Sequence, residues 1–208
     1  MEIFPEDKWI DWVDQLSAQD YVVVDDFISE TDFRMIRSFL ESKMEEDEFS
    51  KAGIGTQQAY QVDTSIRGDF VYWLDLPRDE EMRPFFMLAE EVVRNLNRLC
   101  FLSLSGFEFH LAHYPSGAFY KRHVDQFRER RNRLISVVIY LNDNWQPGDG
   151  GELKIFQPED REVRVEPIAR RCVMFKSDVV EHEVAETRVS RYSLTGWLLY
   201  NPPGLGYL

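Results

Sequence analysis

The sequence predicts an α+β protein in which helices lead into a β-sandwich or jelly roll. Within residues 1–104, three stretches show the 3.6-residue apolar periodicity of amphipathic helices. From residue 105 the chain changes to short segments rich in β-branched and aromatic residues, separated by turn signals. About eight short strands at this spacing are typical of two packed antiparallel sheets.

Three helices are expected in the first half of the chain, at residues 5–19, 29–47 and 79–100. The second begins with a capping-box pattern, in which Ser29 is followed three residues later by Asp32. The second and third helices carry apolar stripes that predict core packing. These stripes are Phe33, Ile36, Leu40 and Met44, and Leu88, Val92, Leu96 and Leu99.

Strands are expected between the helices, at residues 21–28 and 66–75, and throughout the second half. The later strands are predicted at 107–114, 118–125, 133–142, 151–156, 162–167, 171–176, 182–186 and 191–200. Turns are predicted at 146–151 and 158–160. The polar, glycine-containing stretch 49–65 is long for an inert connection, so we interpret it as a lid.

The chain of 208 residues has the size of one domain, and no linker or low-complexity segment divides it. We therefore expect a single domain, residues 1–208. Residues 1–104 would supply helical support, the first strands and the lid, and residues 105–200 the β-rich core. No apolar run approaches the ~20 residues that span a bilayer, and the first residues lack a signal-peptide pattern.

The net charge of −13 argues against nucleic acid or an anionic membrane as the main partner. One basic cluster, FRERRNR at residues 127–133, lies either in a solvated loop or beside a substrate site. The two cysteines, Cys100 and Cys172, are expected to be thiols, which places the protein in a reducing cytoplasm.

The strand predicted at residues 118–125 contains a histidine and an aspartate two positions apart, His123 and Asp125. Strand side chains alternate, so both would point to one face. A charged carboxylate on the inner face of a sheet is costly unless another group compensates its charge, and a metal ion would do so. His182 is the candidate third ligand. Two imidazoles and one carboxylate occupy one face of an octahedron, an arrangement typical of non-haem Fe(II) oxygenases.

Nine residues after His182, Arg191 begins an apolar strand. An arginine that points into the interior needs an anion. A guanidinium binds a carboxylate through two parallel hydrogen bonds, a geometry that lysine cannot reproduce. His110 and Tyr114 are an even number of residues apart on one predicted strand, so their side chains would point to the same face. We therefore expect His110 to border the metal pocket if Tyr114 does, while His113 faces away.

These motifs, in this order, resemble the iron- and 2-oxoglutarate-dependent dioxygenases, and within them the prolyl 4-hydroxylases of the hypoxia-sensing type. The resemblance extends from about residue 20 to 200, and the compact chain is similar to bacterial members. The segments are VVDDF, IRGD with Trp73, YPSGAFYKRHVD, IYLNDNW, GGELKIF and HEVAETRVSRYSLTGW. The fold implied is a double-stranded β-helix (a jelly-roll, cupin-like core) with supporting N-terminal helices.

The resemblance implies Fe(II) at His123, Asp125 and His182, with 2-oxoglutarate and O2 as cosubstrates and ascorbate as reductant. Arg191 would pair with the distal carboxylate of 2-oxoglutarate. The other implied cosubstrate residues are Tyr140 and Thr195, which add hydroxyls, Tyr114 near the iron end, and Leu153 and Trp197 in the apolar wall. Taken alone, those aromatic and apolar residues would be assigned to the core.

The implied reaction is hydroxylation of a prolyl residue at C4 in a protein, for which a loop of a translation elongation factor is a known type of target. Arg67 and Arg133 would lie at the rim of the entrance and contact the peptide. Alternatively, Arg67 and Asp69 form a structural ion pair. Three other functions remain open: oxidation of a free amino acid or other small molecule, demethylation of nucleic-acid bases, which the net charge of −13 disfavours, and a non-catalytic cupin-type binding module.

Overall fold

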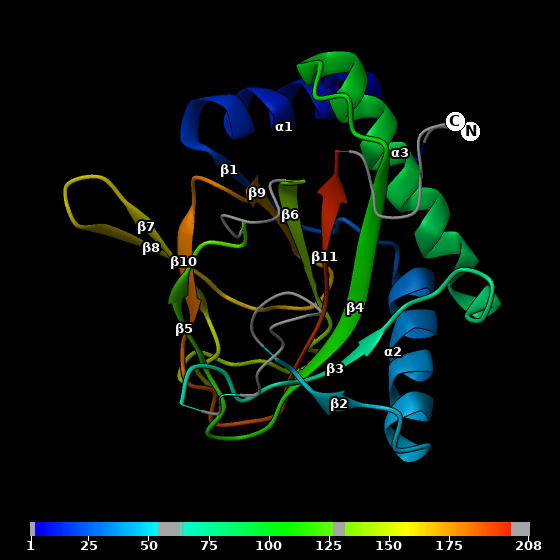
Figure 1. Ribbon diagram of the computed structural model, residues 1–208, viewed down its shortest axis with the longest axis vertical. Helices are drawn as coiled ribbons and strands as arrows, with labels where there is room; N and C mark the ends of the chain where they lie inside the picture. Colours follow the sequence, from blue (N-terminus) through cyan, green and yellow to red (C-terminus); the bar gives the residue numbers. More distant parts are fainter. Residues whose placement is uncertain (1–2, 54–62, 64, 127–131, 201–208) are drawn as a thin grey trace.

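The computed structural model describes residues 3–53, 63, 65–126 and 132–200. Its helices cover one face of a large antiparallel sheet, and a smaller sheet lies on the opposite side (Figure 1). This arrangement confirms the predicted α+β class. Among the described residues, no helix combines the length and apolar composition needed to cross a bilayer.

The three predicted helices are all present: α1 (Glu6–Gln19), α2 (Glu30–Glu45) and α3 (Arg83–Cys100), the last preceded by a short 3-10 helix, η1 (Glu80–Met82). The cap predicted for the second helix forms, because the Ser29 hydroxyl accepts a hydrogen bond from the backbone N–H of Asp32 at 3.0 Å. The apolar stripes of α2 and α3 are buried in the core on the helical side of the large sheet, except that Met44 and Leu99 are only partly buried.

Two antiparallel sheets make up the β structure. The larger has the order β1-β9-β6-β11-β4-β3-β2, and the smaller has the order β5-β10-β7-β8. The larger sheet comprises β1 (Tyr21–Val24), β2 (Ser50–Lys51), β3 (Phe70–Trp73), β4 (Gly106–Tyr114), β6 (Arg133–Tyr140), β9 (Cys172–Lys176) and β11 (Arg191–Leu199). The smaller comprises β5 (Tyr120–His123), β7 (Leu153–Gln157), β8 (Arg161–Val165) and β10 (Glu181–Val184).

Several predictions need correction. The strand predicted at 66–75 comprises only Phe70–Trp73. The first strand ends at Val24, because the chain turns at Asp26, whose φ of 53° is incompatible with a strand. The strand predicted at 118–125 ends at His123, so Asp125 lies just beyond it. Part of the stretch interpreted as a lid is strand β2, which pairs with β3. Residues 54–62 and 64 of that stretch, and 127–131 of the basic cluster, lie outside the described residues.

Side-chain alternation along β4 divides the interior into two cores. Phe109 and Leu111 point toward the helices and join a core with side chains of α1, α2 and α3. Ala112 and Tyr114 point the other way, into a second core between the two sheets. The space between the sheets also receives polar side chains, and it contains the candidate site.

Candidate active site

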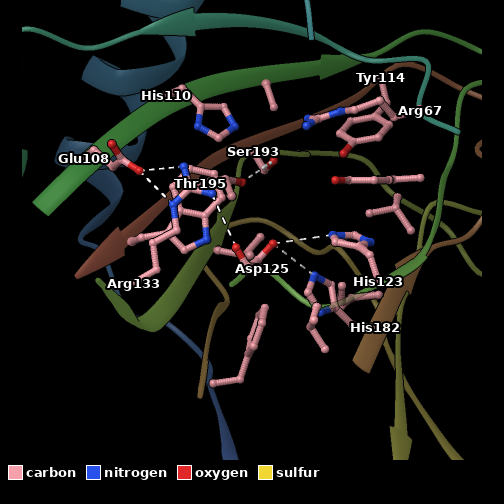
Figure 2. A pocket seen from close by; sticks show the side chains of 18 of the residues that line it. Arg67, Glu108, His110, Tyr114, His123, Asp125, Arg133, His182, Ser193 and Thr195 are labelled. Carbon is pink, nitrogen blue, oxygen red and sulfur yellow. Dashed lines mark hydrogen bonds and ion pairs between the residues drawn. The ribbon is translucent and has the colours of Figure 1, made fainter. Parts of the chain in front are cut away.

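A cavity of about 400 Å³ opens between the two sheets (Figure 2). Every site residue proposed from the sequence lines this cavity except Tyr140, which is fully buried behind its wall. The residues in the lining are Arg67, Tyr114, His123, Asp125, Arg133, Leu153, His182, Arg191, Thr195 and Trp197. The expectation for His110 is confirmed as well, since it lines the cavity while His113 stacks on Tyr192 on the opposite face.

His123, Asp125 and His182 form a cluster whose ligand atoms all lie within 4.8 Å of one another. The pairing of β5 with β10 places His123 directly opposite His182, although the two are far apart in sequence. The Asp125 Oδ1 atom lies 3.5 Å from His123 Nε2 and 3.7 Å from His182 Nε2. Sheet register therefore brings the two imidazoles together, and Asp125, just beyond the end of β5, adds the carboxylate.

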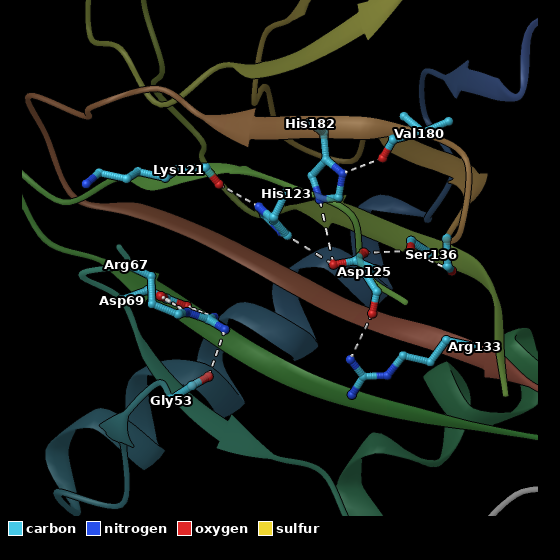
Figure 3. Close-up of polar contacts among 11 residues, drawn as sticks. Gly53, Arg67, Asp69, Lys121, His123, Asp125, Arg133, Ser136, Val180 and His182 are labelled. Atoms are coloured by element: carbon cyan, nitrogen blue, oxygen red, sulfur yellow. Dashed lines mark hydrogen bonds and ion pairs between the residues drawn. The ribbon is translucent and has the colours of Figure 1, made fainter. Parts of the chain in front are cut away.

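Hydrogen bonds fix the orientation of both imidazoles (Figure 3). Nδ1 of His123 donates to the carbonyl of Lys121 at 2.6 Å, and Nδ1 of His182 donates to the carbonyl of Val180 at 3.0 Å. Burial lowers the pKa of His182 to about 4, so this ring is neutral at physiological pH. With Nδ1 as its donor, the neutral His182 ring carries its lone pair on Nε2, and the Nε2 atoms of both histidines face Asp125, as metal coordination requires.

The Asp125 carboxylate is held by a pair of buried serines. Its Oδ2 atom accepts a hydrogen bond from Ser136 Oγ at 2.6 Å, and Ser136 Oγ lies 2.8 Å from Ser177 Oγ. Burial acts to raise the pKa of Asp125, but His182, His123 and the Ser136 hydroxyl together lower it well below its usual range. One carboxylate oxygen is thus anchored while the other faces the histidines, and the three residues fit a divalent transition metal.

We expect Ser136→Ala to weaken metal binding by roughly 10- to 100-fold, the usual effect of removing a group that orients a ligand. Ser177→Ala should have a smaller effect, because Ser177 contacts Asp125 only through Ser136. Calorimetric titration with Mn²⁺ measures both affinities. An affinity for Mn²⁺ equal to that of the unmodified protein would show that this hydroxyl does not position the carboxylate.

Arg191 is a buried guanidinium, 2% exposed, at the start of β11. Its Nε donates to the carbonyl of Gly151 at 2.8 Å, and the guanidinium carbon lies 4.9 Å and 5.1 Å from the ring centroids of Tyr114 and Tyr140. No carboxylate among the described residues forms an ion pair with it. A buried charge without a counter-ion is costly, so this corner is suited to an anionic ligand.

The surroundings of Arg191 supply neutral hydrogen-bond donors for the same anion. Burial raises the pKa of Tyr140 to about 12, although the nearby Arg191 guanidinium acts to lower it, so Tyr140 keeps its proton. Its buried hydroxyl lacks a well-formed hydrogen bond in the described part of the chain. Ser193 and Thr195 follow Arg191 on the same face of β11, with their hydroxyl oxygens 3.1 Å apart. A carboxylate bound near Arg191 would therefore find both a cationic partner and several hydroxyl groups.

Gly151, which the sequence analysis did not single out, makes room for Arg191. It has a φ of +77°, and a Cβ atom there would lie 2.8 Å from Cδ of Arg191. The sequence marks Gly151 only as part of a turn, since its contact is with a residue 40 positions away.

The two arginines proposed at the entrance are both paired with carboxylates. Arg67 donates to both oxygens of Asp69, at 2.7 and 2.6 Å, so the ion pair considered as an alternative is present (Figure 3). Arg133 donates to Glu108 Oε1 at 2.9 and 2.6 Å, and its guanidinium lies 3.5 Å from the ring centroid of Trp197. The lining of the cavity therefore includes guanidinium groups that are already neutralised, and aromatic rings beside them.

Comparison with known proteins agrees with this geometry. The family model described as "2OG-Fe(II) oxygenase superfamily" matches residues 109–199. The crystal structure of a Pseudomonas putida prolyl-4-hydroxylase is 35% identical, with a TM-score of 0.83 over 92% of this chain and 98% of that chain. The chain belongs to the prolyl 4-hydroxylase family of 2-oxoglutarate- and Fe(II)-dependent oxygenases. The resemblance drawn from the motifs is confirmed.

Other members of the prolyl 4-hydroxylase family are similar over most of this chain. A prolyl hydroxylase from Trichoplax adhaerens, in complex with a hypoxia inducible factor oxygen degradation domain peptide fragment, is 25% identical, with a TM-score of 0.82. That alignment covers 93% of this chain and 90% of the other. A prolyl 4-hydroxylase from Phytophthora capsici, 24% identical, shares the fold with a TM-score of 0.75 over 94% of this chain and 65% of that chain.

Family membership makes the chain a 2-oxoglutarate-dependent dioxygenase, and it implies Fe(II), 2-oxoglutarate and O2. The predicted jelly-roll fold is confirmed as well, since the neighbouring structures are oxygenases of this architecture.

Proposed function

We propose that this oxygenase hydroxylates C4 of a prolyl residue in a protein or peptide. The observation that supports this most strongly is the shared cavity. The His123–Asp125–His182 cluster and the unpaired Arg191 guanidinium face one space, in a chain similar to prolyl 4-hydroxylases over nearly its whole length.

In this proposal the metal-binding atoms are Nε2 of His123, Oδ1 of Asp125 and Nε2 of His182. When bound, Fe(II) supplies O2 activation: 2-oxoglutarate becomes succinate and CO2, one oxygen atom of O2 enters succinate, and the other enters the substrate C–H bond. Ascorbate would serve as the reductant that keeps the iron ferrous.

The chain's own residues would bind the cosubstrate and exclude water. Arg191, Tyr140 and Thr195 would bind the distal carboxylate of 2-oxoglutarate through charge-assisted and hydroxyl hydrogen bonds. Tyr114 would lie near the end of the cosubstrate closer to the metal. Leu153 and Trp197, both buried, would form the apolar wall that keeps the site dry.

The substrate would enter at the mouth of the cavity, where Arg67 and Arg133 lie. Because each guanidinium is already paired, we propose that they shape the entrance and stack on neighbouring rings, rather than attract acidic side chains. A similar prolyl hydroxylase was crystallised with a peptide, which supports a peptide substrate here. The candidate substrate is a prolyl residue in a loop of a translation elongation factor, which would place the enzyme in the cytoplasm.

Mass spectrometry tests this function directly. The protein is incubated with Fe(II), 2-oxoglutarate and ascorbate, and with either proline-containing peptides from elongation factor loops or free proline. We expect one added oxygen on the proline of a peptide, and none on the matched peptide with alanine in its place. Oxidation of free proline alone, with every peptide unchanged, would favour the small-molecule alternative and contradict the proposal.

A further inference from the structure

His110 is a buried polar residue of the cavity to which the roles above assign nothing. It lies in the middle of β4, is 4% exposed, and points its ring from the larger sheet into the cavity (Figure 2). Two indoles contact the imidazole from adjacent sides, with ring centroids at 4.8 Å for Trp73 and 5.5 Å for Trp197, and the indoles lie 6.1 Å from each other. Among the described residues nothing hydrogen-bonds this ring, and its Nδ1 atom is shielded from solvent as well.

The protonation state of His110 follows from its burial. Burial lowers the pKa of His110 to about 3, and the nearby charge of Arg67 acts in the same direction, so the ring is neutral at physiological pH. A neutral imidazole has one N–H and one lone pair. Unpaired buried N–H groups are rarer in proteins than unpaired acceptors, so the proton belongs on Nε2 rather than on the shielded Nδ1. The ring then offers the cavity one donor.

The position of His110 on the sheet places this donor between the mouth and the cosubstrate corner. Pairing aligns Trp73, His110 and Thr195 in one row across β3, β4 and β11. Trp73 is 45% exposed, whereas the hydroxyl of Thr195 lies 3.1 Å from that of Ser193, two residues from Arg191 on β11. Across the sheet, His110 therefore lies between the exposed Trp73 and Thr195.

The cationic donors at the mouth are already engaged. Arg67 is bound to Asp69 and to the carbonyl of Gly53, and Arg133 is bound to Glu108. His110 is thus a donor that lines the cavity and lacks a protein partner in the described part of the chain.

We propose that His110 recognises the substrate by donating a hydrogen bond to a backbone carbonyl adjacent to the target proline. This inference rests on the proposed function, in which a prolyl peptide is the substrate. Proline has no backbone N–H, so the amide that precedes it offers only an acceptor, and a site that binds it must supply the donor. The two indoles hold the imidazole in place, which reduces the entropy lost when the hydrogen bond forms.

The test compares His110→Leu, His110→Gln and His113→Leu in the iron-loaded, full-length protein, with the peptide that the unmodified enzyme hydroxylates. His110→Leu should lower kcat/KM for the peptide by about tenfold, the effect of leaving a buried carbonyl without its donor. His110→Gln restores an N–H donor and should recover most of the loss. His113→Leu, on the same strand but the opposite face, should change nothing.

Two further measurements separate substrate recognition from other roles. The KM for 2-oxoglutarate and the rate of uncoupled decarboxylation should stay within about twofold in all three variants, because the missing contact is made only with the peptide. A second probe is a peptide in which sulfur replaces one carbonyl oxygen, either that of the residue before the proline or that of the proline itself, because sulfur is a weaker hydrogen-bond acceptor. One of these two substitutions should slow peptide hydroxylation by the unmodified enzyme. The same substitution should not change the rate of His110→Leu.

The outcomes distinguish this inference from the proposed function. If the unmodified enzyme hydroxylates no proline peptide, the proposed function fails and the assignment of His110 falls with it. Peptide hydroxylation that is equal in the unmodified enzyme and His110→Leu would reject His110 alone. A raised KM for 2-oxoglutarate would place His110 on the cosubstrate. Failure of His110→Gln to recover activity, with an unchanged melting temperature, would reduce its role to packing.

Discussion

Alanine at His123, Asp125 or His182 is expected to abolish 2-oxoglutarate turnover. Each substitution removes one of three ligands whose atoms lie within 4.8 Å of one another, and the described chain offers no further histidine or carboxylate in that cluster. The loss of succinate release should exceed the roughly 10- to 100-fold effect of removing a group that only orients a ligand. Binding of Mn²⁺ should weaken in parallel, which ties the lost activity to the metal.

A matched control for these variants is His113→Ala. His113 is a histidine of the same jelly roll, but it stacks on Tyr192 at 4.8 Å on the face away from the cavity. This variant should retain both turnover and Mn²⁺ binding. Succinate release above background by a triple His123→Ala, Asp125→Ala, His182→Ala protein would show that the metal lies elsewhere.

The helices, most strands and the cap at Ser29 could be predicted from local patterns in the sequence, because each depends on residues within a few positions of one another. His123 and Asp125 do not share one continuous strand, as strand alternation would require, because β5 ends at His123. Asp125 still faces His182 because Ser136, on β6, holds its carboxylate.

Contacts that depend on sheet register could not be predicted from local pattern. Glu108 neutralises Arg133 from a position 25 residues away on another strand. The sequence suggested that Arg133 would contact the peptide at the entrance, but it gave no sign that Glu108 already binds this guanidinium. The contacts of His110 with Trp73 and Trp197 have the same origin, since they require β3, β4 and β11 to lie side by side.

Arg191→Lys is expected to raise the KM for 2-oxoglutarate by roughly 10- to 150-fold, which corresponds to the loss of about 1.5–3 kcal/mol from a charge-assisted pair. A lysine keeps the charge, but it cannot donate to the Gly151 carbonyl and bind a carboxylate bidentately at once. Mn²⁺ binding should survive, because Arg191 does not belong to the His123–Asp125–His182 cluster.

Kinetics at varied 2-oxoglutarate concentration, together with Mn²⁺ titration, measure the two effects of Arg191→Lys separately. Arg161→Lys, at an exposed position on β8, is the matched control and should leave the KM unchanged. Gly151→Ala should reproduce part of the Arg191 defect, since the added methyl group would lie 2.8 Å from Cδ of Arg191 and displace the guanidinium. An unaltered KM in Arg191→Lys would mean that the distal carboxylate binds elsewhere, and the unpaired charge at the start of β11 would need another anion.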